Sequence, residues 1–391
     1  MLMEADRNSL TDKQQAKLEI KAIQKELAEL QQPLRQAGIP VILLFEGWSG
    51  AGKGRAIGKL ISRLDPRGYQ VCPDTVPEPS EARRPYLWRF WNTLPAKGEM
   101  TVLDRGWYRD LLSGTRAEER LLPAIRTFER QLRDDGYLIL KFFLHIGRET
   151  QRARLEKLNA DPNTAWRAGR RDWAENNDYD KLARQADQIL SASSPDWAPW
   201  HVIWNEDKQD GVLRILRIVR DALNHAISHG VAPSRKEPEQ PPLLDMPALA
   251  DVDLSPSVAE KDYEHLLDKE RKRLRKLHSA IYRERVPVIL GFEGWDAAGK
   301  GGAIQRLSWA LDPRGFDVIP IAAPAPEALA RHYLWRFWRE LPKDGHVAIF
   351  DRTWYGRVLV ERVEGLTPPE RWQMAYGEIN EFEAELVRWG A

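Results

Sequence analysis

Gly294-Trp-Asp-Ala-Ala-Gly-Lys-Gly301 is the stretch of sequence from which the expected fold follows. It comes after the apolar run 288–292 and before a helical pattern, which is the setting of a P-loop. In such a loop, backbone N–H groups approach phosphate oxygens, and the helix N-terminus adds a favourable partial charge. The residues expected to bind phosphate are Gly294, Gly299, Lys300, Gly301 and Gly302. The alternative is a glycine-rich turn without a ligand, but the strand, the lysine and a downstream aspartate together favour the P-loop.

The predicted metal site consists of carboxylates. A P-loop usually has a Ser or Thr after its lysine, whose hydroxyl binds Mg²⁺, and here Gly301 stands in that place. Asp296 lies inside the loop, and Asp351 ends the apolar run 347–351. An aspartate at the end of a buried strand is the Walker-B arrangement, which brings a carboxylate beside the P-loop. We therefore expect Asp296 and Asp351 to hold Mg²⁺.

Arginines follow the second aspartate. Arg352 and Arg357 are expected to face the phosphates, because planar guanidinium groups bind phosphate oxygens in pairs. The alternative is that both are partners in surface ion pairs. The aromatic run Tyr333–Trp338 is expected to pack in the core, and Arg336 within it is a further candidate for phosphate contact.

Most of the chain is a repeat. Pro40–Trp48 returns as Pro287–Trp295, an offset of 247 residues, and 38 of the 70 positions from residue 40 to residue 109 are identical in the second copy. This period is far longer than a solenoid unit, so we expect a domain duplicated in tandem. The expected domains are residues 1–229 and 256–391, joined by a Pro-rich polar linker at 230–255.

The predicted fold class is α/β, with a parallel sheet between helices in a three-layer arrangement. Short apolar runs alternate with helical patterns, which is typical of parallel sheets covered on both faces. The runs expected to form strands in the first copy are 41–45, the residues around Val71, 100–103, 138–144 and 201–204. Gly390 corresponds to Gly136, so the second copy is expected to stop before its lid and its last strands, and this piece alone is expected to be nearly inactive.

Composition excludes several classes of protein. There are 59 Lys and Arg residues against 58 Asp and Glu, and this balance argues against a general nucleic-acid or membrane binder. The longest apolar runs are too short to span a bilayer. Cys72 is the single cysteine and residues 1–10 contain no apolar signal segment, so a cytoplasmic location is expected.

These motifs resemble the polyphosphate kinase 2 family. The resemblance lies in Glu293–Gly302, Tyr333–Trp338 and Phe350–Arg357, and extends over both copies. It implies a P-loop kinase fold close to thymidylate kinase with a helical lid, and the tandem layout resembles the subgroup that phosphorylates AMP to ADP with inorganic polyphosphate. It also implies a homo-oligomer.

The same resemblance implies a role for each matching residue. Asp296 would act on the accepting phosphate as base or metal ligand, and Lys300 would hold the phosphates. Asp351 would bind Mg²⁺, and Arg352 would stabilise charge on the transferring group.

The first copy departs from this pattern. It keeps Lys53, Asp104 and Arg105, but Ser49 stands in place of Asp296, Arg55 in place of Gly302 and Gly106 in place of Thr353. Asp110 stands in place of Arg357, which reverses a charge near the expected polyanion. We therefore expect the first copy to be structural or to hold polyphosphate, without transferring phosphate, although it keeps a lid-like segment at 148–172.

Other functions stay open at this stage. The acceptor could be ADP instead of AMP, since no residue pattern here identifies the acceptor. An ATP-dependent nucleotide kinase is disfavoured because both P-loop lysines lack a following Ser or Thr. A non-catalytic phosphate-binding or assembly module is the alternative from another class.

Overall fold

The computed structural model describes residues 1–2, 12–73, 75–115, 118–234 and 251–391. The chain divides into two compact units. Unit 1 comprises Met1–Val76, Thr93–Arg235 and Ala330–His332, and unit 2 comprises Pro77–Asn92, Lys236–Leu329 and Tyr333–Ala391. Most of the predicted linker 230–255 lies outside the described residues. The predicted domain boundaries stay a prediction, and no sequence pattern indicates that residues 77–92 group with unit 2.

Unit 1 is built on a parallel five-stranded sheet with strand order β2-β3-β1-β4-β5. Its strands are β1 (Val41–Gly47), β2 (Tyr69–Cys72), β3 (Met100–Asp104), β4 (Leu138–His145) and β5 (Trp200–Trp204). The central strands β1 and β4 are buried almost throughout, which explains why they are continuous apolar runs. The predicted α/β class with a parallel sheet is confirmed.

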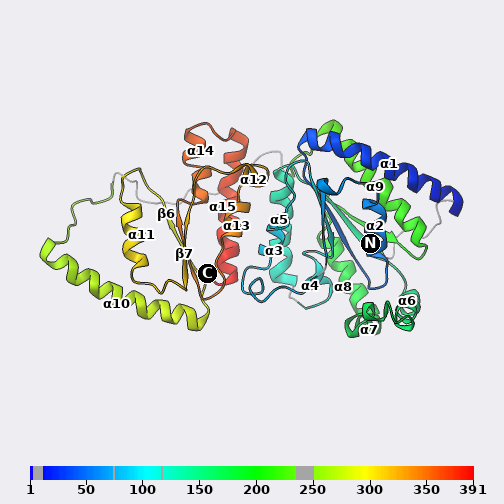
Figure 1. The fold of residues 1–391 in the computed structure, drawn as a ribbon, viewed down its shortest axis with the longest axis horizontal. Coiled ribbons are helices and arrows are strands. Elements are labelled where there is room, and N and C mark those ends of the chain that lie inside the picture. Colours follow the sequence, from blue (N-terminus) through cyan, green and yellow to red (C-terminus); the bar gives the residue numbers. More distant parts are fainter. Residues whose placement is uncertain (3–11, 74, 116–117, 235–250) are drawn as a thin grey trace. The chain divides into compact units, whose positions relative to one another are not determined.

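Helices cover both faces of this sheet. The helices of unit 1 are α1 (Lys13–Ala37), α2 (Lys53–Ile61), α4 (Arg109–Leu112), α5 (Glu118–Asp134), α6 (Arg148–Ala160), α7 (Arg170–Asn177), α8 (Tyr179–Ala192) and α9 (Lys208–His229). Figure 1 shows α1, α2 and α9 on one side of the sheet and α5 and α8 on the other. The apolar stripe of α1, which includes Ile23, Leu27 and Leu34, is buried, and α1 packs mainly against α9.

Unit 2 contains a parallel three-stranded sheet with strand order β6-β8-β7. Its strands are β6 (Val288–Phe292), β7 (Phe316–Pro320) and β8 (Val347–Asp351). Its helices are α3 (Trp88–Trp91), α10 (Glu260–Glu284), α11 (Lys300–Ser308), α12 (Pro326–Leu329), α13 (Trp335–Arg339), α14 (Val360–Val363) and α15 (Pro369–Trp389). Val288 pairs with Val347 as Val41 pairs with Met100 in unit 1, so the strand carrying the P-loop neighbours the Walker-B strand in both units.

The aromatic run of unit 2 packs in its interior, as expected. Trp335, Phe337 and Trp338 are buried. Trp338 meets Phe382 of α15 edge to face, with ring centroids 5.2 Å apart, and Phe337 meets Trp354 in the same way. This aromatic cluster anchors the segment that follows β8 and therefore helps to position the residues after Asp351.

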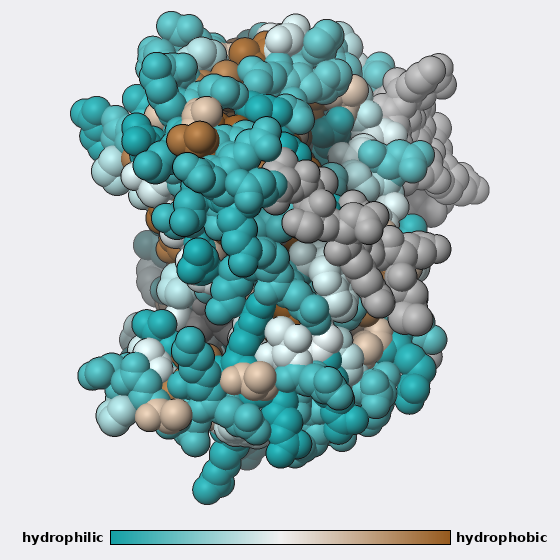
Figure 2. Space-filling view, turned by 90° about the vertical axis from the view of Figure 1, so that its right-hand side faces the viewer, coloured by the Kyte–Doolittle hydropathy of each residue, from teal (hydrophilic) through white to brown (hydrophobic). Residues whose placement is uncertain are grey.

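The surface is polar where it can be examined. Hydrophilic residues predominate on the face drawn in Figure 2, and hydrophobic ones are scattered among them. Within the described ranges, no helix combines the length and the apolar character needed to cross a membrane.

Candidate active site

The glycine-rich segment 294–299 of unit 2, which is predicted to be a P-loop, connects β6 to α11. Gly294 (φ 151°) and Gly299 (φ 93°) have backbone angles that favour glycine, and Gly299 is the residue that caps α11. Nζ of Lys300 donates to the carbonyl oxygens of Gly294 at 2.8 Å and Trp295 at 2.9 Å. The Lys300 side chain thus extends from the end of the loop back to the carbonyl groups at its start. A Cβ added at Gly301 would meet no heavy atom within 4 Å, so the space beside this residue is open.

Two of the predicted residues meet directly beside this loop. Nη2 of Arg352 donates to Oδ1 of Asp296 at 3.0 Å. The Asp296 side chain is 93% exposed and that of Arg352 is 48% exposed, so both are accessible to a substrate. An exposed pair of this kind contributes little to stability. Both charged groups can therefore bind a ligand at little cost in stability.

Arg352 is held in place by an unusual backbone. Its φ is 67°, in the left-handed region that non-glycine residues rarely adopt, and its N–H donates to the carbonyl of Phe292 at 3.0 Å. Arg105 has φ 62° at the matching place in unit 1, where its N–H bonds to Phe45. Backbone strain of this type costs about 1–3 kcal/mol and occurs most often at functional sites.

A carboxylate that the sequence analysis did not single out supports the loop. Oε1 of Glu293 accepts hydrogen bonds from both N and Oγ1 of Thr353, each at 2.7 Å. In unit 1, Glu46 accepts from the N–H of Gly106 at 2.8 Å. Glu293 therefore ties the start of the P-loop to the segment after Asp351, and its presence in both copies was the signal that could have identified it.

The exchange of Thr353 for Gly106 has a packing explanation. A Cβ at Gly106 would lie 2.3 Å from Cδ1 of Leu44, and one at Gly291 would lie 2.9 Å from Cγ2 of Thr353. Each unit therefore pairs one glycine with one larger side chain, Leu44 with Gly106 or Thr353 with Gly291. The glycine at position 106 of the first copy is therefore explained by the larger side chain of Leu44 beside it.

The other two arginines are bound to protein groups. Nη1 of Arg357 lies 2.7 Å from Oε2 of Glu361 and donates to the hydroxyl of Thr367, and its guanidinium lies 4.4 Å from the ring of Tyr333. Arg336 donates to the carbonyl of Ala322 at 2.9 Å and lies 3.9 Å from Glu361. Burial lowers the pKa of Arg336. Glu361 thus offsets one of the two positive charges, and phosphate contact by Arg357 stays a prediction.

The carboxylates suit a hard divalent cation. Asp351 is the last residue of β8 and lies opposite Phe292, the last residue of β6, while Asp296 follows in the loop. In the part of the chain that the structure describes, no cluster of three or more His, Cys, Asp or Glu residues could hold a metal alone. Mg²⁺ is commonly bound by one or two carboxylates and completed by water and substrate phosphates, so the available donors fit it.

Known proteins resemble this chain in both sequence and fold. A family model described as polyphosphate kinase 2 matches residues 10–229 and 257–391. The chain belongs to the polyphosphate kinase 2 family. The resemblance drawn from Glu293–Gly302, Tyr333–Trp338 and Phe350–Arg357 is thereby confirmed.

Relatives in the polyphosphate kinase 2 family include enzymes named polyphosphate:AMP phosphotransferase. The one from Pseudomonas aeruginosa is 39% identical over 380 residues, which are 94% of this chain and 76% of the relative. The one from Acinetobacter johnsonii is 32% identical over 88% of this chain and 71% of the relative. The crystal structure of a polyphosphate kinase 2 from Pseudomonas aeruginosa PA01 matches with a TM-score of 0.83 at 35% identity, covering 100% of this chain and 79% of that one.

Proposed function

We propose that this protein transfers a phosphoryl group from inorganic polyphosphate to AMP, giving ADP, with Mg²⁺ as cofactor and the second copy as the catalytic P-loop kinase domain. The observation that carries the proposal is the open P-loop of unit 2, where Lys300 crosses the loop and Asp296 bonds to Arg352. The names of the related phosphotransferases support the choice of donor and acceptor.

Phosphoryl transfer makes modest demands on the protein. A phosphate oxygen of AMP attacks the terminal phosphorus of polyphosphate, the bridging P–O bond breaks, and the shortened polymer leaves as an oxyanion. A phosphate monoester has its second pKa at about 6, so the attacking oxygen needs no strong base near neutral pH. Catalysis then consists of alignment and of neutralising oxygen charge.

The side chains of unit 2 fit these tasks. Lys300 would neutralise phosphate oxygens at the loop, and Arg352 would bind the transferring group. Asp296 would orient the accepting phosphate through Arg352 or through the metal. Asp296 and Asp351 would hold Mg²⁺, which would supply positive charge to neutralise phosphate oxygens.

The first copy has a supporting role in this proposal. Ser49 has no carboxylate at the place of Asp296, and Asp110 replaces the positive charge of Arg357. We assign the enzyme to the cytoplasm as a homo-oligomer without nucleic-acid or membrane partners, which is consistent with its balanced charge and single cysteine.

The deciding experiment measures ADP formation by the full-length protein from AMP, Mg²⁺ and polyphosphate. A parallel reaction replaces polyphosphate by ATP, another replaces AMP by ADP and is followed by ATP formation, and a third contains EDTA. We expect ADP only with polyphosphate, and none with EDTA. Activity with ATP alone would make the protein an ordinary nucleotide kinase, a clear preference for ADP would change the acceptor, and inactivity with both donors would favour a phosphate-binding module.

A further inference from the structure

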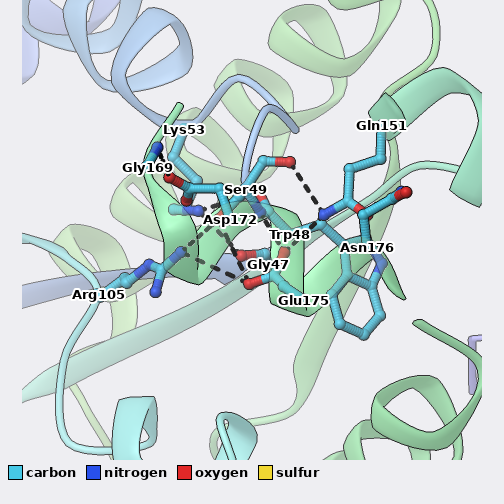
Figure 3. A network of polar contacts seen from close by, with 10 residues as sticks. All are labelled: Gly47, Trp48, Ser49, Lys53, Arg105, Gln151, Gly169, Asp172, Glu175 and Asn176. Atoms are coloured by element: carbon cyan, nitrogen blue, oxygen red, sulfur yellow. Dashed lines mark hydrogen bonds and ion pairs between the residues drawn. The ribbon is translucent and has the colours of Figure 1, made fainter. Parts of the chain in front are cut away.

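The P-loop of unit 1 already contains an anion. Glu175, on helix α7, lies 126 residues along the chain from Ser49, and the two meet at the loop. The backbone N–H of Ser49 donates to Oε1 of Glu175 at 2.6 Å, and the Ser49 hydroxyl donates to Oε2 at 3.3 Å. Figure 3 shows this carboxylate among the loop residues. Backbone N–H groups of a P-loop bind phosphate oxygens, so here a carboxylate takes up such a donor.

Further donors complete the carboxylate site. Nε2 of Gln151, on helix α6, donates to Oε1 of Glu175 at 2.6 Å. Nη2 of Arg105, the arginine that follows β3, lies 3.9 Å from Oε2 and donates to the Ser49 hydroxyl at 3.1 Å. Gln151 is fully buried and the Glu175 side chain is only 19% exposed. A carboxylate with this many donors, shielded from water, is held more firmly than one in an exposed ion pair.

The helices that carry these groups are closed over the loop. Nη1 of Arg154 donates to the carbonyls of Gly50 at 3.1 Å and Ala51 at 3.3 Å, and Gln151 also donates to the carbonyl of Ser49. Asn176, next to Glu175, donates to Oε1 of Gln151 at 2.9 Å and is buried. Helices α6 and α7 thus lie on the loop through an interlocked set of hydrogen bonds.

In both units a carboxylate lies near the arginine that follows the aspartate strand, but it comes from a different segment of the chain in each. In unit 2, Arg352 binds Asp296, a carboxylate of the loop that is open to solvent. In unit 1 the loop residue is Ser49, and the carboxylate near Arg105 belongs to Glu175 on helix α7. The loss of the loop aspartate and the closure by Glu175 therefore belong together.

We infer that the first P-loop is a self-occupied anion site, in which Glu175 takes the place of a phosphate and keeps the first copy closed to polyphosphate. This deepens the proposed function, on which it rests for the identity of the ligand. The first copy is then a locked scaffold and does not hold the polymer. Removing the Glu175 carboxylate takes away an acceptor shared by Ser49, Gln151 and Arg105, whose place a phosphate group can then take.

Binding of tripolyphosphate tests this inference without requiring activity. The full-length protein carries Lys300→Ala to weaken the second loop, and isothermal titration calorimetry compares it with the same protein plus Glu175→Ala. We expect Glu175→Ala to add one binding event, with affinity at least tenfold above any binding in the parent, and Lys53→Ala to abolish that event. Glu149→Ala, which removes an exposed carboxylate of the neighbouring helix α6, serves as the matched control and should add none.

Hydrogen exchange gives a second measurement in the same proteins. Amides 49–53 and 170–177 should exchange slowly in the parent with or without tripolyphosphate. They should exchange faster in Glu175→Ala and regain protection when the probe is added. Glu175→Gln removes the charge and keeps the side-chain volume, so it replaces the alanine variant if that one does not fold, and a smaller gain in binding is expected because the amide still occupies part of the site.

Two results would overturn the inference. One is a parent protein that already loses a binding event when Lys53 is replaced, because the first loop would then be open. The other is a folded Glu175 variant, shown by an unchanged circular dichroism spectrum, that gains no site. Failure of ADP formation would count against the proposed function and leave both binding results unaffected.

Discussion

Nη2 of Arg352 and Oδ1 of Asp296 lie 3.0 Å apart and join the P-loop of unit 2 to the end of its Walker-B strand. Replacing Asp296 by Asn removes the negative charge but keeps the shape. We expect ADP formation to fall by about 10²–10⁴-fold, the range for loss of a group that handles protons or charge in the transition state. The assay is ADP release under saturating AMP and polyphosphate.

The unfolding temperature of the Asp296→Asn variant provides the control. The side chain is almost fully exposed, so the midpoint should stay that of the parent. Activity within tenfold of the parent would remove Asp296 from the catalytic set.

The two P-loop lysines should differ in their importance for turnover. Lys300→Ala removes the phosphate-facing charge of unit 2 and should reduce kcat by at least 10²-fold. Lys53→Ala alters a loop that Glu175 already fills, and activity per folded molecule should stay within about threefold. Comparable losses in both variants would contradict the assignment of catalysis to the second copy.

Lys53 should leave a signature in the pH dependence of stability. Burial, and then the nearby Arg105, lower its pKa from 10.5 to about 8. Between these two values the unfolded chain binds a proton that the folded chain does not, so the free energy of unfolding rises with pH across this window. A shift of this size corresponds to a few kcal/mol at most.

The measurement is the unfolding midpoint from pH 7 to 10.5 for the parent and for Lys53→Met. The difference between the two proteins should be flat below about pH 8 and should then move in favour of the parent. Curves that stay parallel over the whole range would show that Lys53 has an ordinary pKa.

A buried ion pair predicts a stability effect in unit 1. Nζ of Lys141 lies 2.7 Å from Oε2 of Glu129, and the two side chains are 0% and 1% exposed. Lys141→Met leaves Glu129 buried without its cation and should cost about 3–5 kcal/mol. Lys25→Met breaks an exposed Lys–Glu pair of the same unit and should cost at most about 1 kcal/mol.

Urea unfolding compares these variants, and the double variant Lys141→Met with Glu129→Leu is the further control. Removing both charges should recover most of the lost stability. Equal midpoints for Lys141→Met and Lys25→Met would mean that the buried pair contributes no more than a surface one.

The parallel sheet could be predicted because its strands are short apolar runs between helices. The runs 41–45 and 138–144 became β1 and β4, each extended by a residue or two at the ends. The proximity of Asp296 and Arg352 could also be predicted, because a P-loop strand and a Walker-B strand are neighbours in such a sheet.

Side-chain contacts between segments that are joined by loops could not be predicted. No sequence pattern distinguishes Glu175 from the other charged residues of its helix. It accepts a hydrogen bond from the loop only because that helix packs over Ser49. Glu361 likewise binds Arg357 and approaches Arg336 through a turn whose path the sequence pattern does not specify. Side-chain pairings across loops depend on tertiary packing and not on periodicity.

The exchanged volumes of Leu44 with Gly106 and Gly291 with Thr353 restrict the route by which one copy could be converted into the other. Introducing threonine at position 106 first would place its Cβ 2.3 Å from Leu44, a collision inside a packed core. Replacing Leu44 by glycine first leaves a cavity, which costs stability but permits folding. If the second loop is rebuilt stepwise within the first copy, the order of substitutions therefore matters. Leu44 must be replaced by a smaller residue before Gly106 is replaced by a larger one.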